Sequence, residues 1–214
     1  MSRHSLNLLR ANILQMAKKY ISNDGWSEDI FNTLATNSNL KYAEMITLFP
    51  NGYRSLIYLY LEEINDKMTE ESNKINLIRL KTHQRIREII LLRLKIMLKE
   101  KILIQKTYFH LLLPQNFKIS LKSVYKSVDQ IWFLAGDNST DFNFYSKRVI
   151  LAKIYSMVIF HFVNNDSLDE TTKVLDKQLN MTSKIPKIKN RLKDVAEGLP
   201  QLVKIIGNIS SIRR

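Results

Sequence analysis

Residues 128–148 read VDQIWFLAGDNSTDFNFYSKR, an apolar segment that a short polar run, Gly136 to Thr140, interrupts. Aromatic residues flank the interruption on both sides. Asp137, Ser139 or Thr140 can each cap a following helix, because a side-chain oxygen there accepts from the free N–H groups at a helix start. Taken alone, the pattern favours a corner between two helices with ordinary aromatic packing. The flanking rings are Trp132, Phe133, Phe142, Phe144 and Tyr145.

The run IW-x-x-AGD-x-STDFN-x-Y-x-x-R in this stretch resembles the hallmark of the ubiquinone (coenzyme Q) biosynthesis accessory proteins, which have a TetR-like fold. Two N-terminal patterns, Gly25-Trp26-Ser27 and Leu48-Phe49-Pro50-Asn51-Gly52, resemble the first helices of that family. The segment from Asp166 to Asp176 and the basic C-terminal helix fit it as well. The match covers nearly the whole chain. Its central motif is long and specific, whereas ordinary TetR-type regulators share the N-terminal outline.

We expect an all-α, TetR-like fold: three short N-terminal helices, a larger helical body and a C-terminal amphipathic helix. Only five Gly and four Pro occur in 214 residues, so helix breakers are scarce. Helices are predicted over about residues 5–22, after a cap at Ser27, from Lys41 to before Pro50, and from Asn51 onward. The expected parts are 1–50, helix-turn-helix-like; 51–183, a lipid-binding body; and 184–214, an amphipathic membrane-facing helix.

Within the body, apolar residues at three- to four-residue spacing predict one long basic helix over about residues 77–105. A helix through Leu121, Val128 and Trp132 reaches the polar corner. After it, residues 149–163 are apolar on almost every side, which predicts a helix that is buried or lines an apolar cavity. A last body helix is predicted over about residues 168–181.

The net charge of +13 is unevenly placed. Residues 1–72 hold seven Lys/Arg against nine Asp/Glu, and residues 128–183 hold five against seven. Residues 73–127 hold thirteen against two, and residues 184–214 hold eight against two. DNA affinity depends mainly on Lys and Arg side chains that neutralise the backbone phosphates. A TetR-type transcriptional regulator with a hydrophobic effector is the alternative function. The N-terminal helices of such a regulator should be basic, whereas residues 1–72 of this chain hold more acidic than basic residues, so we expect no specific DNA binding.

Catalytic patterns are missing from the sequence. There is no cysteine, and the four histidines are scattered without the Glu-x-x-His or His-Glu-x-x-His spacing of helical metal sites. Gly-rich phosphate loops and a Gly-x-Ser-x-Gly elbow are also missing. The sequence therefore favours a binding protein over an enzyme, with no catalytic, cofactor-binding or metal-binding residues.

The apolar helix after the corner is the expected ligand site. The family resemblance implies an isoprenoid or phospholipid ligand held in an apolar pocket of the body. Arg148 is expected at the pocket mouth, where a guanidinium can hold phosphate oxygens. The competing interpretation is an ion pair with Asp129, Asp137 or Asp141. The expected lipid-binding residues are Arg148, Tyr155, Val158 and Phe162.

The resemblance also implies a partner, the di-iron hydroxylase of the demethoxyubiquinone step, bound at the corner. Ile131 stands where the family commonly has methionine, and Phe144 replaces a tryptophan, which removes an indole N–H donor. The alternative is that the aromatic rings form the seam between two helices. The expected partner-binding residues are Asp129, Ile131, Trp132, Phe144, Tyr145 and Arg148.

The C-terminal segment carries an apolar stripe with lysines on its other face. Such a helix can lie in a bilayer interface, or it can form a coiled-coil or dimer contact. Gly198 and Pro200 predict a kink, which argues against a regular coiled coil. The resemblance implies membrane lipids as partners and a homodimer. The expected membrane-binding residues are Ile185, Ile188, Leu192, Leu199, Leu202 and Ile206.

These patterns lead to three candidate functions. The first is an accessory protein that lifts a polyprenylated quinone precursor from the bilayer and presents it to the hydroxylase. The others are the regulator and a lipid-binding helical protein of unrelated role. Because the first helix begins almost at Met1 with no targeting segment before it, we expect a bacterial cytoplasmic protein peripheral to the inner membrane. A mitochondrial location is expected only for a mature or truncated form.

Overall fold

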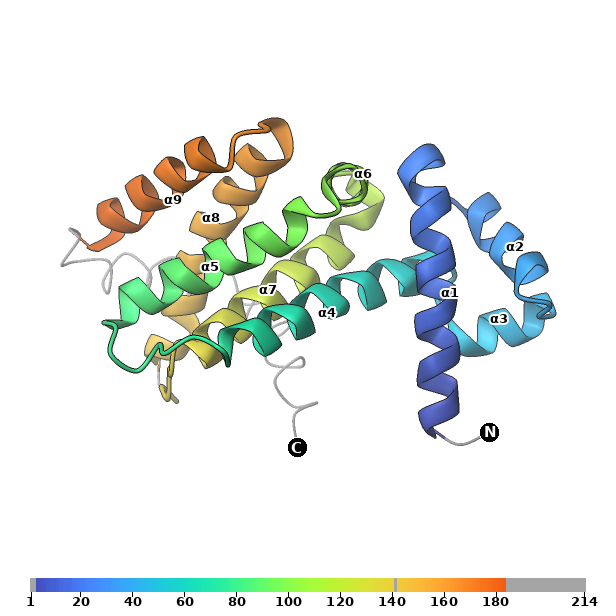
Figure 1. Cartoon of the computed structure of the whole chain (residues 1–214), viewed down its shortest axis with the longest axis horizontal. Helices are drawn as coiled ribbons and strands as arrows, with labels where there is room; N and C mark the ends of the chain where they lie inside the picture. Colours follow the sequence, from blue (N-terminus) through green and yellow to red (C-terminus); the bar gives the residue numbers. More distant parts are fainter. Residues whose placement is uncertain (1–2, 141, 184–214) are drawn as a thin grey trace.

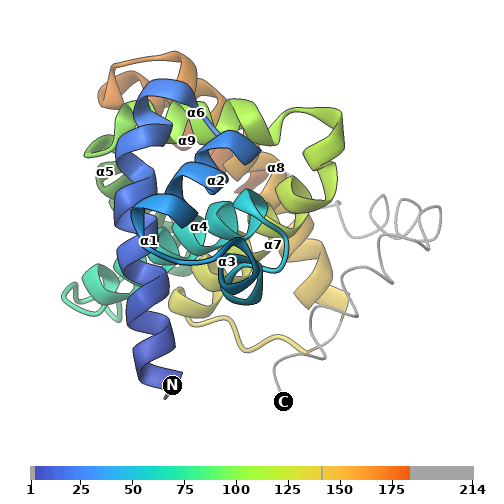
Figure 2. The same cartoon turned by 90° about the vertical axis from the view of Figure 1, so that its right-hand side faces the viewer.

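The computed structural model describes residues 3–140 and 142–183, and this part of the chain is folded into α-helices with one short 3₁₀ turn. Three helices form the N-terminal end of the molecule, on the right in Figure 1: α1 (Arg3–Asp24), α2 (Glu28–Asn37) and α3 (Tyr42–Leu48). Figure 2 looks onto this end, with the body behind it. The three N-terminal helices predicted from the sequence are thus confirmed, although α1, with 22 residues, is not short.

The body contains the remaining helices. α4 runs from the N-terminal helices into the body, where α5 and α7 lie beside it, α8 packs on α7, and α9 packs on α5 and α8 (Figure 1). α6 crosses between α1 and α8. The bounds are α4 (Tyr53–Ser72), α5 (Thr82–Leu98), α6 (Lys101–Leu111), η1 (Pro114–Asn116), α7 (Phe117–Leu134), α8 (Phe142–Asn164) and α9 (Leu168–Ser183).

Local sequence signals explain how the N-terminal helices begin and end. Gly25 adopts a positive φ of 82° after α1, a conformation that glycine tolerates. The Ser27 side chain then accepts a hydrogen bond from the Ile30 N–H, which confirms the predicted cap of α2. Between them, the Trp26 indole donates to the Thr107 hydroxyl of α6 at 3.0 Å. This bond joins the N-terminal helices to the body.

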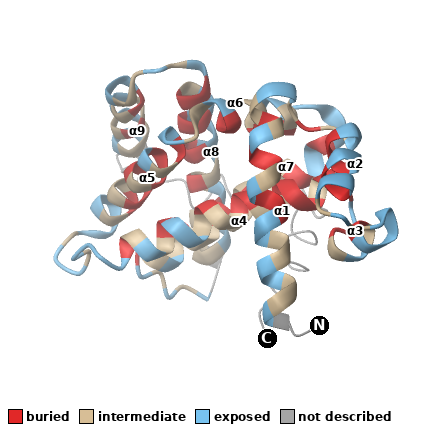
Figure 3. Ribbon diagram, turned by 45° about the vertical axis from the view of Figure 1, so that its right-hand side comes forward, coloured by how far each residue is buried: buried red, intermediate tan, exposed pale blue. Residues whose placement is uncertain are grey.

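The core lies where the helices face one another, as the red segments of Figure 3 show. α4 supplies its centre. A stripe of apolar residues at three- to four-residue spacing runs along this helix, and every member has less than a tenth of its surface exposed. The stripe consists of Tyr53, Ile57, Tyr60, Ile64 and Met68.

The predicted single basic helix over residues 77–105 is wrong. Residues 77–80 form turns, and the chain then forms two helices, α5 and α6, separated at Lys99 and Glu100. Glu100 sits at the break and accepts hydrogen bonds from Lys18 of α1, the shorter at 3.0 Å. Lys18 also donates to Glu63 of α4 at 2.9 Å. The change of direction here lets α6 pack on α1 and α8. Because tertiary packing causes the break, no proline or glycine marks it in the sequence.

Within residues 3–140 and 142–183, no helix is both long enough and apolar enough to cross a membrane. The most apolar helix, α8, packs against α6, α7 and α9. The predicted membrane-facing segment 184–214 lies outside the described residues. That holds for each of its expected membrane-binding residues, Ile185, Ile188, Leu192, Leu199, Leu202 and Ile206.

Candidate functional site

The corner between α7 and α8 begins with a helix stop. Gly136 has φ +81°, and its N–H donates to the Phe133 carbonyl while the N–H of Asp137 donates to the Trp132 carbonyl, both at 3.0 Å. These two bonds, one inside the other, are the Schellman motif, which closes the last turn of a helix around a left-handed glycine. The stop fixes where Asp137 lies relative to α7.

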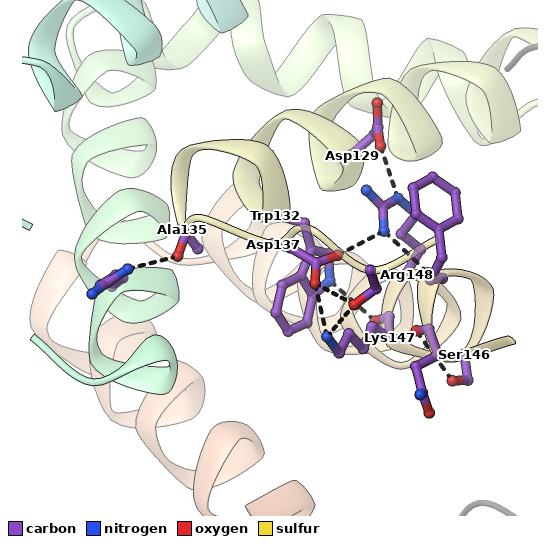
Figure 4. Close-up of polar contacts among 11 residues, drawn as sticks. Asp129, Trp132, Ala135, Asp137, Ser146, Lys147 and Arg148 are labelled. Carbon is purple, nitrogen blue, oxygen red and sulfur yellow. Dashed lines mark hydrogen bonds and ion pairs between the residues drawn. The ribbon is translucent and has the colours of Figure 1, made fainter. Parts of the chain in front are cut away.

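Charged side chains from α8 then hold the corner (Figure 4). Arg148 donates from Nε to Asp129 at 2.8 Å and from Nη1 to Asp137 at 3.1 Å. The other oxygen of Asp137 accepts from Lys147 at 2.7 Å and from Ser139 at 2.6 Å. Two carboxylates and two cations therefore join the end of α7 to the beginning of α8.

This network decides the charge state of Asp137. Burial alone would raise the pKa of its carboxyl, but the hydrogen bonds from Lys147, Ser139 and Arg148 outweigh burial and lower the pKa to about 2. The Asp137 side chain is only 3% exposed. The carboxylate is thus a buried anion whose lone pairs are occupied by protein donors.

The predicted partner-binding residues divide into two groups. Ile131 is completely buried and the Arg148 side chain is 5% exposed, so neither can touch a partner in this structure, and their assignment to a docking surface is corrected. Asp129 is 14% exposed and its carboxylate is paired with Arg148. These three residues build the corner from within.

The aromatic members lie further out. Trp132 is half-buried, with its indole N–H donating to the Lys147 carbonyl at 3.2 Å. Phe144 and Tyr145 meet edge to face at 5.2 Å between ring centres, and Tyr145 is exposed. Phe133, 59% exposed, was not predicted, because it occupies an unspecified position of the motif. Aromatic side chains such as Trp and Tyr are enriched among the residues that dominate the binding energy of protein interfaces.

A cavity of about 90 Å³ lies in the body between α6, α7 and α8. Its walls are mainly apolar. Three exposed residues, Leu112, Ser156 and Phe160, belong to its lining, so the cavity opens to the surface beside them. The lining comprises Tyr108, Leu111, Leu112, Ser120, Ser123, Val124, Tyr155, Ser156, Ile159, Phe160 and Val163.

The predicted lipid-binding residues are only partly at this cavity. Tyr155 lines it, whereas Val158 and Phe162 are buried in the core elsewhere on α8. Arg148 does not line it; it precedes Tyr155 by about two helical turns, or about 10 Å along the axis. Of the two roles expected for Arg148, the ion pair is the one observed, and its placement at the pocket mouth is corrected.

Sequence comparison shows which protein family the corner resembles. Residues 117–186, which include all of it, match the sequence profile of the COQ9 family. The rat protein named "Ubiquinone biosynthesis protein COQ9, mitochondrial" is 28% identical over 198 residues, covering 88% of this chain and 63% of that protein. The resemblance to the COQ9 family is confirmed. The human protein of the same name is 27% identical over 202 residues, covering 90% of this chain and 63% of its own length.

The chain therefore spans slightly less than two thirds of the length of the rat and human COQ9 proteins. The COQ9 relatives from rat, human, cattle and Dictyostelium discoideum all carry the word mitochondrial in their names. They point to a mitochondrial protein, so the predicted bacterial cytoplasmic location is wrong. That prediction relied on where the sequence begins, and a chain that spans part of its relatives carries no information there.

Structural comparison identifies the fold. A TetR transcriptional regulator from Nitrosomonas europaea ATCC 19718 superimposes with a TM-score of 0.64 at 16% sequence identity, covering 83% of this chain and 99% of that chain. An identity this low establishes the fold alone. The predicted all-α, TetR-like architecture is confirmed.

Proposed function

We propose that the protein is a lipid-binding accessory protein of ubiquinone biosynthesis, which presents a polyprenylated quinone precursor to a di-iron hydroxylase without itself catalysing a reaction. The names of the COQ9 relatives support the pathway. The observation that carries the binding role is the apolar cavity between α6, α7 and α8, open at Leu112 and Phe160. Membrane attachment through residues 184–214 and a homodimer remain part of the proposal.

The surroundings of the cavity suit a chain-like apolar ligand. At about 90 Å³ the cavity accommodates only one end of such a molecule. The rest would run over the exposed apolar residues at and next to the rim, which gain about 25 cal/mol for each Å² of apolar surface removed from water. Besides Leu112 and Phe160, the exposed apolar residues within three positions of a lining residue are Phe109, Leu113, Phe117 and Met157.

The alternative of a DNA-binding regulator gains no support from α3, the candidate recognition helix. Its first turn carries Glu44, whose carboxylate accepts the Lys41 backbone N–H at 2.7 Å. An acidic residue at that place repels phosphate, and the helix itself contains no basic residue. The TetR-like fold is therefore proposed to serve lipid binding.

Lipid recovered with the purified protein tests the binding role. Ser156 lines the cavity mouth on α8, so Ser156→Trp should fill the opening and remove most of the lipid found by mass spectrometry. Val149→Trp is the matched control, because Val149 is an exposed residue of the same helix outside the cavity lining. Equal lipid in both variants, or none in the unsubstituted protein, would contradict the proposal.

Hydroxylase binding tests the partner role. Tyr145→Ala removes an exposed ring of the corner, and we expect at least a tenfold weaker affinity, typical of an interfacial aromatic anchor. Helix content and melting temperature should stay unchanged. Tyr42→Ala, at an exposed tyrosine of α3, is the control for loss of a surface ring. If Tyr145→Ala lowers the melting temperature strongly, the ring belongs to the helix seam and not to a docking surface.

A further inference from the structure

Arg93 of α5 is completely buried, yet none of the ion pairs among the described residues involves it. Its guanidinium donates to the Tyr155 hydroxyl at 2.7 Å, to the Asn65 side-chain oxygen at 2.6 Å and to the Ser127 hydroxyl at 3.0 Å. All three partners are neutral. A buried charge held only by neutral groups polarises each of them strongly, because little solvent screens it.

This polarisation reaches the cavity through two tyrosines. The Tyr155 hydroxyl lies 3.1 Å from the Tyr108 hydroxyl, and both residues line the cavity. Burial raises the pKa of Tyr108, so the ring keeps its proton. The two hydroxyls carry two protons, and the contact between them uses only one. The bond from Arg93 uses none, because the Tyr155 oxygen accepts there through a lone pair. One phenolic proton is therefore left to donate to a further acceptor.

A second polar group of the cavity wall, the Ser123 hydroxyl, has no hydrogen-bond partner in the part of the chain that the structure describes. Ser123 is 9% exposed and lines the same cavity, and its Oγ makes no hydrogen bond with the described residues. A buried hydroxyl without a partner destabilises a protein by about 1–3 kcal/mol. An apolar cavity that contains such a group and a spare phenolic proton is suited to a ligand bearing oxygen.

We propose that the cavity binds the oxygen-bearing ring end of a quinone or phenol, with a ring oxygen hydrogen-bonded by the Tyr108–Tyr155 pair and by Ser123. The apolar tail leaves the cavity between Leu112 and Phe160. This orientation rests on the proposed lipid-binding function and adds a head-first direction to it. Arg93 acts through Tyr155 as a positioning residue, because it binds the Tyr155 hydroxyl and, unlike Tyr155, does not itself line the cavity.

Two probes of equal tail length separate head recognition from tail burial: decylubiquinone, which carries ring oxygens, and decylbenzene, which has none. Tyr108→Phe keeps the ring in the cavity wall and removes one hydroxyl. We expect its affinity for decylubiquinone to fall about tenfold, as the loss of a polarised hydrogen bond predicts, with decylbenzene affinity unchanged. Tyr42→Phe, at an exposed tyrosine of α3, should change neither.

Ser123→Ala adds a readout that a merely structural serine would not give. Removing an unpaired buried hydroxyl should leave the empty protein as stable or more stable, while decylubiquinone affinity falls and decylbenzene affinity does not. If both probes weaken equally, or neither weakens, in the two cavity variants, the head-first proposal is wrong and lipid binding stands. If neither probe binds the unsubstituted protein, the proposed function fails as well.

Discussion

At the scale of single residues, the corner is governed by Asp137. Its two oxygens accept from Lys147, Ser139 and Arg148, so the folded protein favours the ionised carboxylate more than the unfolded chain does. The pKa falls from its ordinary value of 3.8 to about 2. A group with a lowered folded-state pKa stabilises the protein above the unfolded value and loses that contribution as pH falls through the folded one.

We therefore expect stability to decline between about pH 4 and pH 2, by on the order of 2 kcal/mol from this group. Asp137→Asn should be less stable at pH 6 and should lose this part of the pH dependence. Urea unfolding at a series of pH values measures both. Asp24→Asn, at an exposed carboxylate at the end of α1, is the control and should follow the unsubstituted protein. If the unfolding free energy of Asp137→Asn declines with falling pH as steeply as that of the unsubstituted protein, the network does not stabilise the fold.

The sequence predicts the corner better than it predicts which residues face outward. The motif places Arg148 beside acidic residues, and the ion pair with Asp129 was one of two alternatives that followed from it. Ile131 was assigned to the surface because it lies in the motif, yet it is fully buried. A motif records which residues occur together, and it does not distinguish side chains that contact a partner from those that position them.

At the scale of elements, two glycine turns offer a matched comparison. Gly25 and Gly136 have nearly the same positive φ, +82° and +81°. A Cβ on Gly25 would meet nothing within 4 Å, whereas one on Gly136 would lie 3.1 Å from the Arg85 guanidinium. That guanidinium donates to the Ala135 carbonyl at 3.2 Å and to the Leu80 carbonyl at 2.8 Å. Arg85 thereby joins the segment before α5 to the corner.

We predict that Gly25→Ala costs about 1 kcal/mol, the strain of a left-handed alanine. Gly136→Ala should cost roughly 1 kcal/mol more, because the methyl group displaces Arg85 from the Ala135 carbonyl. Chemical denaturation of the two variants gives the difference directly. Equal losses would show that the Arg85 contact adds nothing measurable to the stability of the corner.

Helix ends show the same division between local and tertiary causes. The cap at Ser27 and the stop at Gly136 are local, and the sequence signals both. The break at Glu100 is tertiary, because the residue that binds there, Lys18, is distant in the chain. Helical periodicity continues through residues 99–100, so no sequence window could separate α5 from α6.

At the scale of the whole molecule, Arg93 joins four helices. It belongs to α5, and its partners Asn65, Ser127 and Tyr155 belong to α4, α7 and α8. In the sequence it is one of many basic residues in a positively charged segment, and nothing local marks it as buried. The cavity beside Tyr155 was likewise beyond prediction, since its walls come from three helices.

We predict that Arg93→Met destabilises the protein by about 3 kcal/mol, because three buried polar groups lose a charged donor. Thermal and urea unfolding measure the loss. Arg79→Met, at an exposed arginine before α5, is the control and should change stability by less than about 0.5 kcal/mol. A loss no larger than the control's would mean that apolar packing replaces the network without cost.

The Arg93 network also has a consequence for the order of events during folding. Helices next to each other in the chain pair extensively, as α4 does with α5 and α7 with α8, and such local pairs form early. The bonds of Arg93 are completed only when all four helices have docked. Arg93→Met should therefore accelerate unfolding and leave the refolding rate nearly unchanged, which the two limbs of a stopped-flow chevron plot report separately.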